Sequence, residues 1–334
     1  MNMAAARKDG PDLSVIVPVY NAADHLPKLV EQVFGLERSG LRCQMICLDD
    51  ASTDSSVAVL RDLAQQHPSL EILMQANNRG AGNARNDAWP LASGRYTIFF
   101  DADDTLHGEV LIDAIGAMDA EPEVDVAIFA YRYEREKAAS FTDMNYEDKK
   151  TLEHLLQGGK IAIGSIENMA GLLTFTNYPW NKLLRTEHYK REGMRFGSTK
   201  VNNDILGHWH SVLLARSIMV CRAVNCTHVV HPRGYNLTNS FGVDRLTMFD
   251  ALEETYSFLE SRPDQCRHFA HQFWVLTDRL VQWARPRIVP ALLRQFDARY
   301  TDLLVGRLDV GDLARMRTKY SADLADSIVN HLIR

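Results

Sequence analysis

Over the first hundred residues, short runs of apolar and β-branched residues alternate with segments whose apolar residues recur every three or four positions. Four such runs predict strands, at residues 13–19, 44–48, 70–74 and 96–100. Helical spacing follows three of them, over residues 26–36 and 55–66 and in a helix that ends near Leu91. This alternation predicts an α/β fold with a mainly parallel sheet and helices on both faces.

Polar residues come directly after each predicted strand. They lie at residues 18–21, 49–50, 77–79 and 101–104. The carboxyl ends of parallel strands meet at one edge of a sheet, and ligands bind there. Four polar clusters at the same edge therefore predict a binding cleft.

The fourth cluster holds three carboxylates in four positions, Asp101, Asp103 and Asp104. Carboxylates this close repel one another unless a cation lies among them, and a divalent ion held by oxygen ligands meets that need. A solvated acidic turn is the simpler alternative. Residues 100–106 also resemble the first motif of haloacid-dehalogenase-type phosphatases, in which Asp101 would be a nucleophile and Mg²⁺ would neutralise the phosphate.

The second half of the chain is less regular. Residues 124–130 predict another strand, residues 137–150 a polar connection, and residues 151–175 a helical segment. Beyond Leu237 the pattern is helical, most clearly over residues 269–283 and 289–304. We therefore expect a helical C-terminal extension.

Composition places the chain among ordinary globular proteins. It has 334 residues, of which 46% are hydrophobic and 24% charged, and its net charge of -6 argues against nucleic acid as a partner. The five cysteines have no Cys-x-x-Cys spacing, which is typical of reduced thiols. No apolar run has transmembrane length, and the first residues lack the apolar segment of a signal peptide. We expect a cytoplasmic protein.

Four motifs together resemble the family 2 glycosyltransferases, which have the GT-A fold. They are Val-Ile-Val-Pro-Val-Tyr-Asn, Asp-Asp-Ala-Ser-Thr-Asp, Asn-Arg-Gly-Ala-Gly-Asn-Ala-Arg-Asn and Gly-Arg-Tyr-Thr-Ile-Phe-Phe-Asp-Ala-Asp-Asp, within residues 13–110. Their order and spacing argue against the phosphatase, whose motif lies near the chain start. The resemblance implies an inverting enzyme that uses a nucleotide sugar.

The resemblance also implies a donor site. Tyr20 can stack on a pyrimidine beside Pro18, and Asp50, or else Asp49, can accept a hydrogen bond from the uracil N3–H. Arg79 and Arg85 would contact phosphate or hold the carboxylates. Asp103 or Asp104 would reach a Mn²⁺ or Mg²⁺ ion that bridges the diphosphate. The expected donor-binding set is Pro18, Tyr20, Asn21, Asp49, Asp50, Arg79, Arg85, Asp101 and Ala102.

The stretch Tyr178-Pro-Trp-Asn-Lys-Leu-Leu-Arg and residues 201–206 resemble the acceptor half of the family. There an aspartate is the general base, which aligns with Asp204, while Asn203 replaces the usual glutamate. Capping of the following helix is the alternative role for Asp204. The expected acceptor residues are Trp180, Asn181, Lys182 and Trp209, with core packing as the alternative for the tryptophans. His231 and Arg233 would form a loop over the diphosphate.

The sequence thus predicts a polar tail (1–12), a nucleotide-sugar half (13–135), an acceptor half (136–236) and a helical region (237–334). The expected reaction moves a sugar from a UDP-sugar to a hydroxyl of a glycan or lipid-linked acceptor in surface polysaccharide assembly. A non-catalytic relative that binds a sugar nucleotide is the alternative suggested by Asn203. The helical region could be a simple cap, a homodimer face, or a peripheral contact with the inner face of the membrane.

Overall fold

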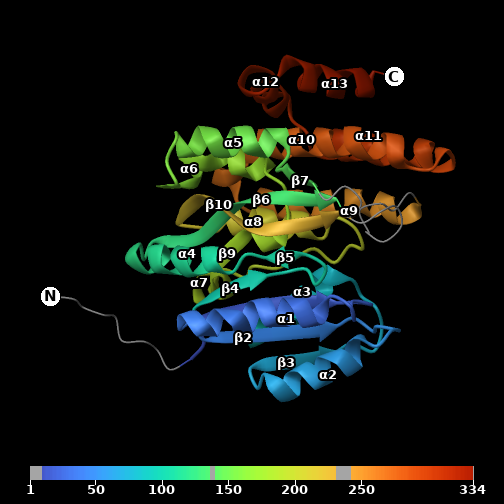
Figure 1. Ribbon diagram of the computed structural model, residues 1–334. Helices are drawn as coiled ribbons and strands as arrows, with labels where there is room; N and C mark the ends of the chain where they lie inside the picture. Colours follow the sequence, from blue (N-terminus) through green and yellow to red (C-terminus); the bar gives the residue numbers. More distant parts are fainter. Residues whose placement is uncertain (1–9, 136–139, 231–241, 334) are drawn as a thin grey trace.

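A ten-stranded sheet forms the centre of the protein (Figure 1). The computed structural model describes residues 10–135, 140–230 and 242–333. The strand order is β3-β2-β1-β4-β9-β6-β10-β5, with β7 paired to β6 and β8 paired to β10. The strands are β1 (Leu13–Val19), β2 (Cys43–Asp49), β3 (Leu70–Met74), β4 (Tyr96–Phe99), β5 (Thr105–Leu106), β6 (Val124–Arg135), β7 (Ser140–Asp143), β8 (Ile161–Gly164), β9 (Lys182–Arg185) and β10 (Ser217–Val230).

The first four strands of the sheet order are parallel, as predicted. β1 pairs with both β2 and β4, and β2 pairs with β3. All seven residues of β2 are buried, because helices cover both faces of a parallel sheet and its strands can be apolar throughout. The polar segments after these strands therefore share one edge, and the predicted α/β fold class is confirmed.

Strands from the predicted acceptor half enter the same sheet. β9 lies antiparallel between β4 and β6, and β6 pairs in parallel with β10. The segment that carries Trp180 to Lys182 thus ends beside β4, the strand that leads to Asp101. The nucleotide-sugar half and the acceptor half are built on one sheet.

Helices flank this sheet, and the C-terminal helices lie at the end of the molecule opposite β3 and α2 (Figure 1). In the described part of the chain, no helix has the length and apolar character needed to cross a membrane. The helices are α1 (Leu26–Phe34), α2 (Ser56–Gln66), α3 (Ala81–Ala88), α4 (Glu109–Ala120), α5 (Tyr146–Leu156), α6 (Ile166–Met169), α7 (Thr186–Arg191), α8 (Asp204–Leu213), α9 (Thr247–Glu260), α10 (Pro263–Ala284), α11 (Leu293–Arg307), α12 (Val310–Lys319) and α13 (Ala322–Leu332).

Two predictions for residues 137–175 were only partly right. The polar connection contains β7 and the start of α5, whose cap residue Asn145 accepts a hydrogen bond from the Asp148 amide. The helical segment predicted over residues 151–175 is interrupted, because α5 ends at Leu156 and β8 follows it before α6 and a 3-10 helix continue to Thr174. The charged residues Glu147, Lys149 and Lys150 lie on the exposed face of α5. The short strand β8 was not predicted because it depends on pairing with β10, which is distant in sequence.

Helix α3 packs very closely on residues 196–203, the segment before α8. A Cβ atom at Gly82 would lie 2.0 Å from the Gly197 carbonyl oxygen and 2.8 Å from the Asn203 Cβ. The Asn86 side chain accepts from the Phe196 amide at 2.8 Å and donates to the Phe196 carbonyl at 3.0 Å. Glycine at position 82 therefore allows the close contact that brings α3 to α8.

We expect Gly82→Ala to lower the free energy of unfolding by about 1–3 kcal/mol, because the added methyl group meets backbone atoms that cannot move aside. Urea denaturation followed by circular dichroism measures the loss. Gly116→Ala in α4 is the matched control, since its Cβ would have no heavy atom within 4 Å, and it should be neutral or stabilising by roughly 0.5–1 kcal/mol. Equal stability of the Gly82→Ala protein and the wild type would contradict the close contact.

Candidate functional site

The ends of β1 and β2 form one wall of the site. Tyr20 is 50% exposed, so part of this residue is accessible to a ligand. Asn21 adopts a left-handed conformation, with φ at 51°. Its side-chain oxygen accepts a hydrogen bond from the Thr53 amide at 2.8 Å. Asn21 therefore fixes the loop after β1 to the loop after β2, and Pro18 is partly exposed.

Asp50 fixes the next loop. Its two carboxylate oxygens accept hydrogen bonds from the Arg79 and Gly80 amides, both at 2.7 Å. One carboxylate oxygen of the adjacent Asp49 accepts from the Ser52 amide, and its Oδ1 is buried without a hydrogen-bond partner among the described residues. The Arg79 guanidinium is 52% exposed and pairs with Asp87 at 2.8 Å. These contacts bring the predicted donor residues of three strands into one wall.

The carboxylates after β4 have different surroundings. Asp101 and Asp103 are partly exposed, whereas Ala102 and Asp104 are buried. Asp104 is held by His228 of β10, with its Oδ1 at 2.8 Å from the ring Nδ1, and by the Val229 amide, which donates at 2.9 Å. Burial raises the pKa of Asp104, and His228 opposes the rise. Asp104 thus anchors this loop to β10 and leaves Asp101 and Asp103 nearer the surface.

Arg85 of α3 joins this loop to the acceptor half. Its Nη2 lies 2.5 Å from the Asp101 Oδ1, and its Nη1 donates to the Asn203 Oδ1 at 3.0 Å. Helix α8 begins at Asp204, so the N-cap residue is Asn203. Asp204 therefore does not occupy the capping position that was its alternative role. The structure therefore brings Asp204 close to Asp101, although 103 positions separate them.

Asp204 has the electrostatic setting of a proton acceptor. Burial raises its pKa to about 6, while the positive charges of Arg85 and Lys182 oppose the rise and the charge of Asp101 adds to it. A carboxylate with this pKa is ionised at neutral pH, yet it is more basic than an ordinary aspartate. Asp204 combines partial exposure with a pKa suited to general base catalysis.

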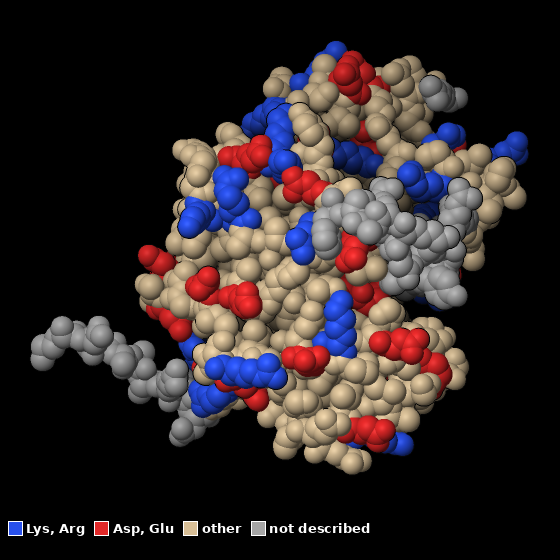
Figure 2. All heavy atoms as spheres, in the orientation of Figure 1, with Lys and Arg blue, Asp and Glu red and all other residues tan. Residues whose placement is uncertain are grey.

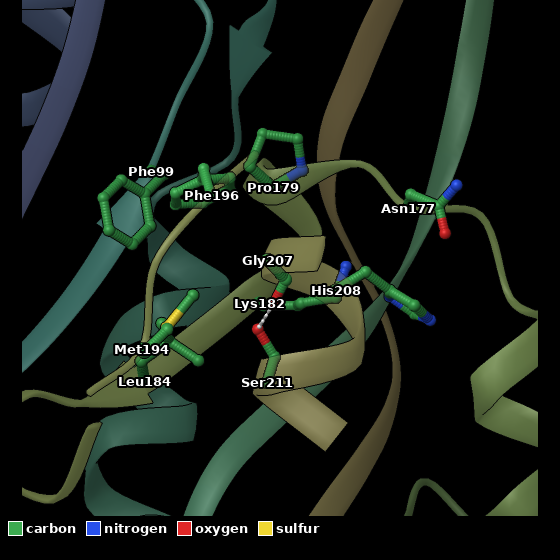
Figure 3. Close-up of a pocket in the computed structure, with 10 residues that line it drawn as sticks. All are labelled: Phe99, Asn177, Pro179, Lys182, Leu184, Met194, Phe196, Gly207, His208 and Ser211. Carbon is green, nitrogen blue, oxygen red and sulfur yellow. Dashed lines mark hydrogen bonds between the residues drawn. The ribbon is translucent and has the colours of Figure 1, made fainter. Parts of the chain in front are cut away.

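The predicted acceptor residues around Trp180 are buried. Trp180 and Trp209 are 0% exposed, and Trp209 packs against Phe273 of α10. Lys182 donates to the Tyr178 carbonyl and the Asn181 side-chain oxygen, both at 2.6 Å, and burial lowers its pKa to about 7. Figure 3 shows Lys182 and His208 lining a small pocket next to α8. The two tryptophan rings pack in the core, which is the alternative that the sequence left open for them.

Two ring side chains beside Trp180 were not among the predicted site residues. Tyr178 stacks on Trp180 with ring centroids 4.4 Å apart, and it is partly exposed where Trp180 is not. His228 packs against Tyr178 at 5.1 Å. Burial is the main cause that raises the pKa of Tyr178, followed by the neighbouring Tyr133, and the charges of Asp204 and Asp104 add to it. The predicted loop residues His231 and Arg233 lie outside the described residues.

The carboxylates suit a divalent ion that is shared with a ligand. Within the described ranges, no group of three or more His, Cys, Asp or Glu residues could hold a metal on its own. Mg²⁺ and Mn²⁺ commonly bind through one or two carboxylates together with substrate phosphates. Asp103 is partly exposed and suits that arrangement, whereas the Asp104 side chain beside it is 0% exposed and is oriented by His228. Elsewhere on the face in Figure 2, acidic and basic side chains are interspersed.

Comparisons with known proteins show the family and the fold of the chain. An uncharacterised glycosyltransferase of Escherichia coli strain K12, YibD, is 36% identical over 34% of this chain and 32% of its own length. The putative teichuronic acid biosynthesis glycosyltransferase TuaG of Bacillus subtilis is 38% identical over 28% of this chain and 36% of its own length. The chain therefore spans only about a third of the length of these curated relatives.

Among solved structures, residues 1–349 of Staphylococcus aureus TarS in complex with UDP-GlcNAc superpose with a TM-score of 0.73. The identity is 19%, and the match covers 96% of this chain and 88% of that one, so it shows a shared fold. The family description Glycosyl transferase family 2 matches residues 14–193, which is more than half of the chain. Because this match covers more than half of its length, the chain belongs to glycosyl transferase family 2.

Proposed function

We propose that this protein is an inverting, metal-dependent glycosyltransferase that moves a sugar from a UDP-sugar to a hydroxyl group of a glycan or lipid-linked acceptor. The observation that carries the proposal is the Arg85 bridge, which brings Asp204 next to the carboxylates after β4. A donor bound at those carboxylates would have its reacting carbon near a base with a pKa of about 6.

Recognition of the nucleotide is assigned to the wall formed by β1 to β3. The half-exposed Tyr20 ring offers a face for the uracil. Asp49 or Asp50 accepts the hydrogen bond from the uracil N3–H, a donor that cytosine lacks. The Asp49 Oδ1, which has no hydrogen-bond partner among the described residues, supports Asp49 in this role, because Asp50 already accepts two backbone amides.

The diphosphate is assigned to the loop after β4. Asp103 and Asp104 would hold Mn²⁺ or Mg²⁺, and the bound ion would neutralise charge on the departing UDP. The half-exposed Arg79 side chain, which pairs with Asp87, is assigned to contact with the same phosphates. Asp101, held by Arg85 at 2.5 Å, remains partly open toward the donor.

Asp204 accepts the proton of the acceptor hydroxyl as its oxygen attacks the anomeric carbon. One carboxylate is sufficient for this step, because a direct displacement has a single nucleophile and inverts the configuration of the carbon. Tyr178, which is partly exposed and stacks on Trp180, is assigned to contact with the sugar rings in place of the buried Trp180. A non-catalytic relative would not need a basic carboxylate at this place.

The biological role assigned here is assembly of a surface polysaccharide. TuaG is named for teichuronic acid biosynthesis, and another relative is a poly(ribitol-phosphate) β-glucosyltransferase of Bacillus spizizenii, 32% identical over 30% of this chain. The TarS structure contains UDP-GlcNAc, and a mannosyltransferase structure of the same fold contains GDP-Man and Mn²⁺. These names support a nucleotide-sugar donor and a glycan or polyol acceptor.

Donor binding tests the proposal. We expect UDP to bind in isothermal titration calorimetry with MnCl₂ present and to bind at least about tenfold more weakly when EDTA replaces the metal, since the ion bridges protein and phosphate. CDP is the matched control and should bind more weakly than UDP, because its base has no N3–H donor. If UDP does not bind, or if CDP binds as well as UDP in Mn²⁺, the proposed donor is wrong.

A further inference from the structure

Helix α3 contacts each part of the proposed site. The amides just before it hold Asp50, and Arg85 holds Asp101 and Asn203. Asn86 holds both backbone groups of Phe196, and Gly82 allows α3 to approach the 196–203 segment. The relative positions of the donor carboxylates and the base helix therefore depend on α3.

Arg85 is buried although it joins Asp101 to Asn203. Its side chain is 5% exposed, its Nη1 and Nη2 each contact a protein oxygen, and its Cζ lies 5.2 Å from the centre of the Phe196 ring. A guanidinium held on two sides and packed on an aromatic ring has a defined orientation. The 52% exposed Arg79, by contrast, can turn toward a phosphate.

We infer that Arg85 is a positioning residue, which sets the start of α8 and thereby the Asp204 carboxylate against Asp101, and is not a ligand of the diphosphate. This inference rests on the proposed function, because it concerns the distance between the base and the donor. The partner on α8 is the neutral Asn203, so the contact orients the helix start without neutralising Arg85. The charge of Arg85 also opposes the rise in the pKa of Asp204.

Positioning predicts a particular kinetic pattern. The Arg85→Lys side chain keeps the charge but cannot donate to Asp101 and Asn203 in a planar fork. A displacement of about 1 Å at the base is enough to lower turnover about a hundredfold. Loss of a phosphate ligand would instead weaken UDP binding, because that contact exists in the bound ground state.

The experiment compares Arg85→Lys, Asn203→Ala, the double variant, and Arg61→Lys as a control on the exposed face of α2. UDP affinity is measured calorimetrically in Mn²⁺. Turnover is measured as UDP release from UDP-glucose, UDP-galactose and UDP-N-acetylglucosamine, using the donor that the wild type hydrolyses fastest. Hydrogen exchange by mass spectrometry follows the 197–206 peptide, a readout that does not need turnover.

We expect Arg85→Lys to lower kcat about 10- to 100-fold while the Kd for UDP changes less than about threefold. Asn203→Ala should lower kcat as well, and the double variant should be no worse than the poorer single variant, because both remove the same bridge. Exchange in the 197–206 peptide should be faster, with Arg61→Lys equal to the wild type in every measurement.

A loss of UDP affinity as large as the loss of kcat/KM would overturn the inference and make Arg85 a phosphate ligand. Unchanged kcat, or additive losses in the double variant, would also overturn it. Failure of the proposed function looks different, because the wild type itself would then bind no UDP or release none. In that case the exchange measurement still decides whether Arg85 holds the start of α8.

Discussion

The Asp204→Asn protein is expected to bind UDP as well as the wild type does and to transfer sugar about 10²- to 10⁴-fold more slowly. Asparagine has nearly the same shape as aspartate but cannot accept the hydroxyl proton. Asp204 opens α8 next to Asn203, which Arg85 holds, so the substitution leaves that bridge in place. Steady-state UDP release and calorimetric UDP affinity separate the two effects.

The control for this variant is Asp302→Asn, an exposed aspartate on α11 far along the chain. It should have wild-type turnover and affinity. Loss of both UDP binding and turnover in Asp204→Asn would indicate that the residue has a structural role. Turnover within about threefold of the wild type would show that another group accepts the proton.

The pH dependence of kcat/KM reports the same carboxylate. Burial raises the pKa of Asp204 to about 6, so its carboxyl group is protonated and inactive as a base below that pH and ionised above it. Activity should therefore rise with pH through about 6 and level off near 7. Arg85 and Lys182 carry the charges that oppose this rise in pKa. A profile that stays flat down to about pH 4.5 would exclude Asp204 as the titrating group.

The second large effect is expected at the other end of the site. Asp103→Asn should lower kcat/KM at least about 100-fold and remove the strengthening of UDP binding by Mn²⁺. A metal ion that neutralises the departing diphosphate is worth several kcal/mol, and about 1.4 kcal/mol corresponds to a tenfold change. Asp103 is the more exposed member of the pair that would hold the ion, because Asp104 is held by His228 and the Val229 amide.

Asp113→Asn in α4 is the matched control, since Asp113 is an exposed aspartate ten positions further along the chain. UDP titrations with Mn²⁺ and with EDTA provide the comparison for both variants. If Asp103→Asn keeps the full difference between the two conditions, Asp103 does not hold the metal.

The parallel part of the fold could be predicted because its signals are local. The strand at residues 96–100 and the polar residues that follow it are adjacent in sequence, so their position at the sheet edge follows from the strand alternation. The same holds for the loops at Tyr20 and Asp50. Strands β7 and β8 were not predicted because they depend on pairing with β6 and β10.

The site was only partly predictable, since its decisive contacts join distant residues. Arg85 and Asn203 are 118 positions apart, and Asp104 and His228 are 124 positions apart. Neither pair has a signal in the local sequence pattern. The two buried tryptophans show a further limit of sequence-based prediction. A tryptophan in the core cannot be distinguished by its sequence alone from one at a sugar-binding surface.

The configuration of the product tests the central claim most directly. The wild type is incubated with Mn²⁺, a UDP-sugar in which the sugar is α-linked, and an acceptor, and the first product is examined by proton NMR at the anomeric position. Direct displacement assisted by the single base Asp204 predicts a β-linked product. An α-linked first product would contradict the account.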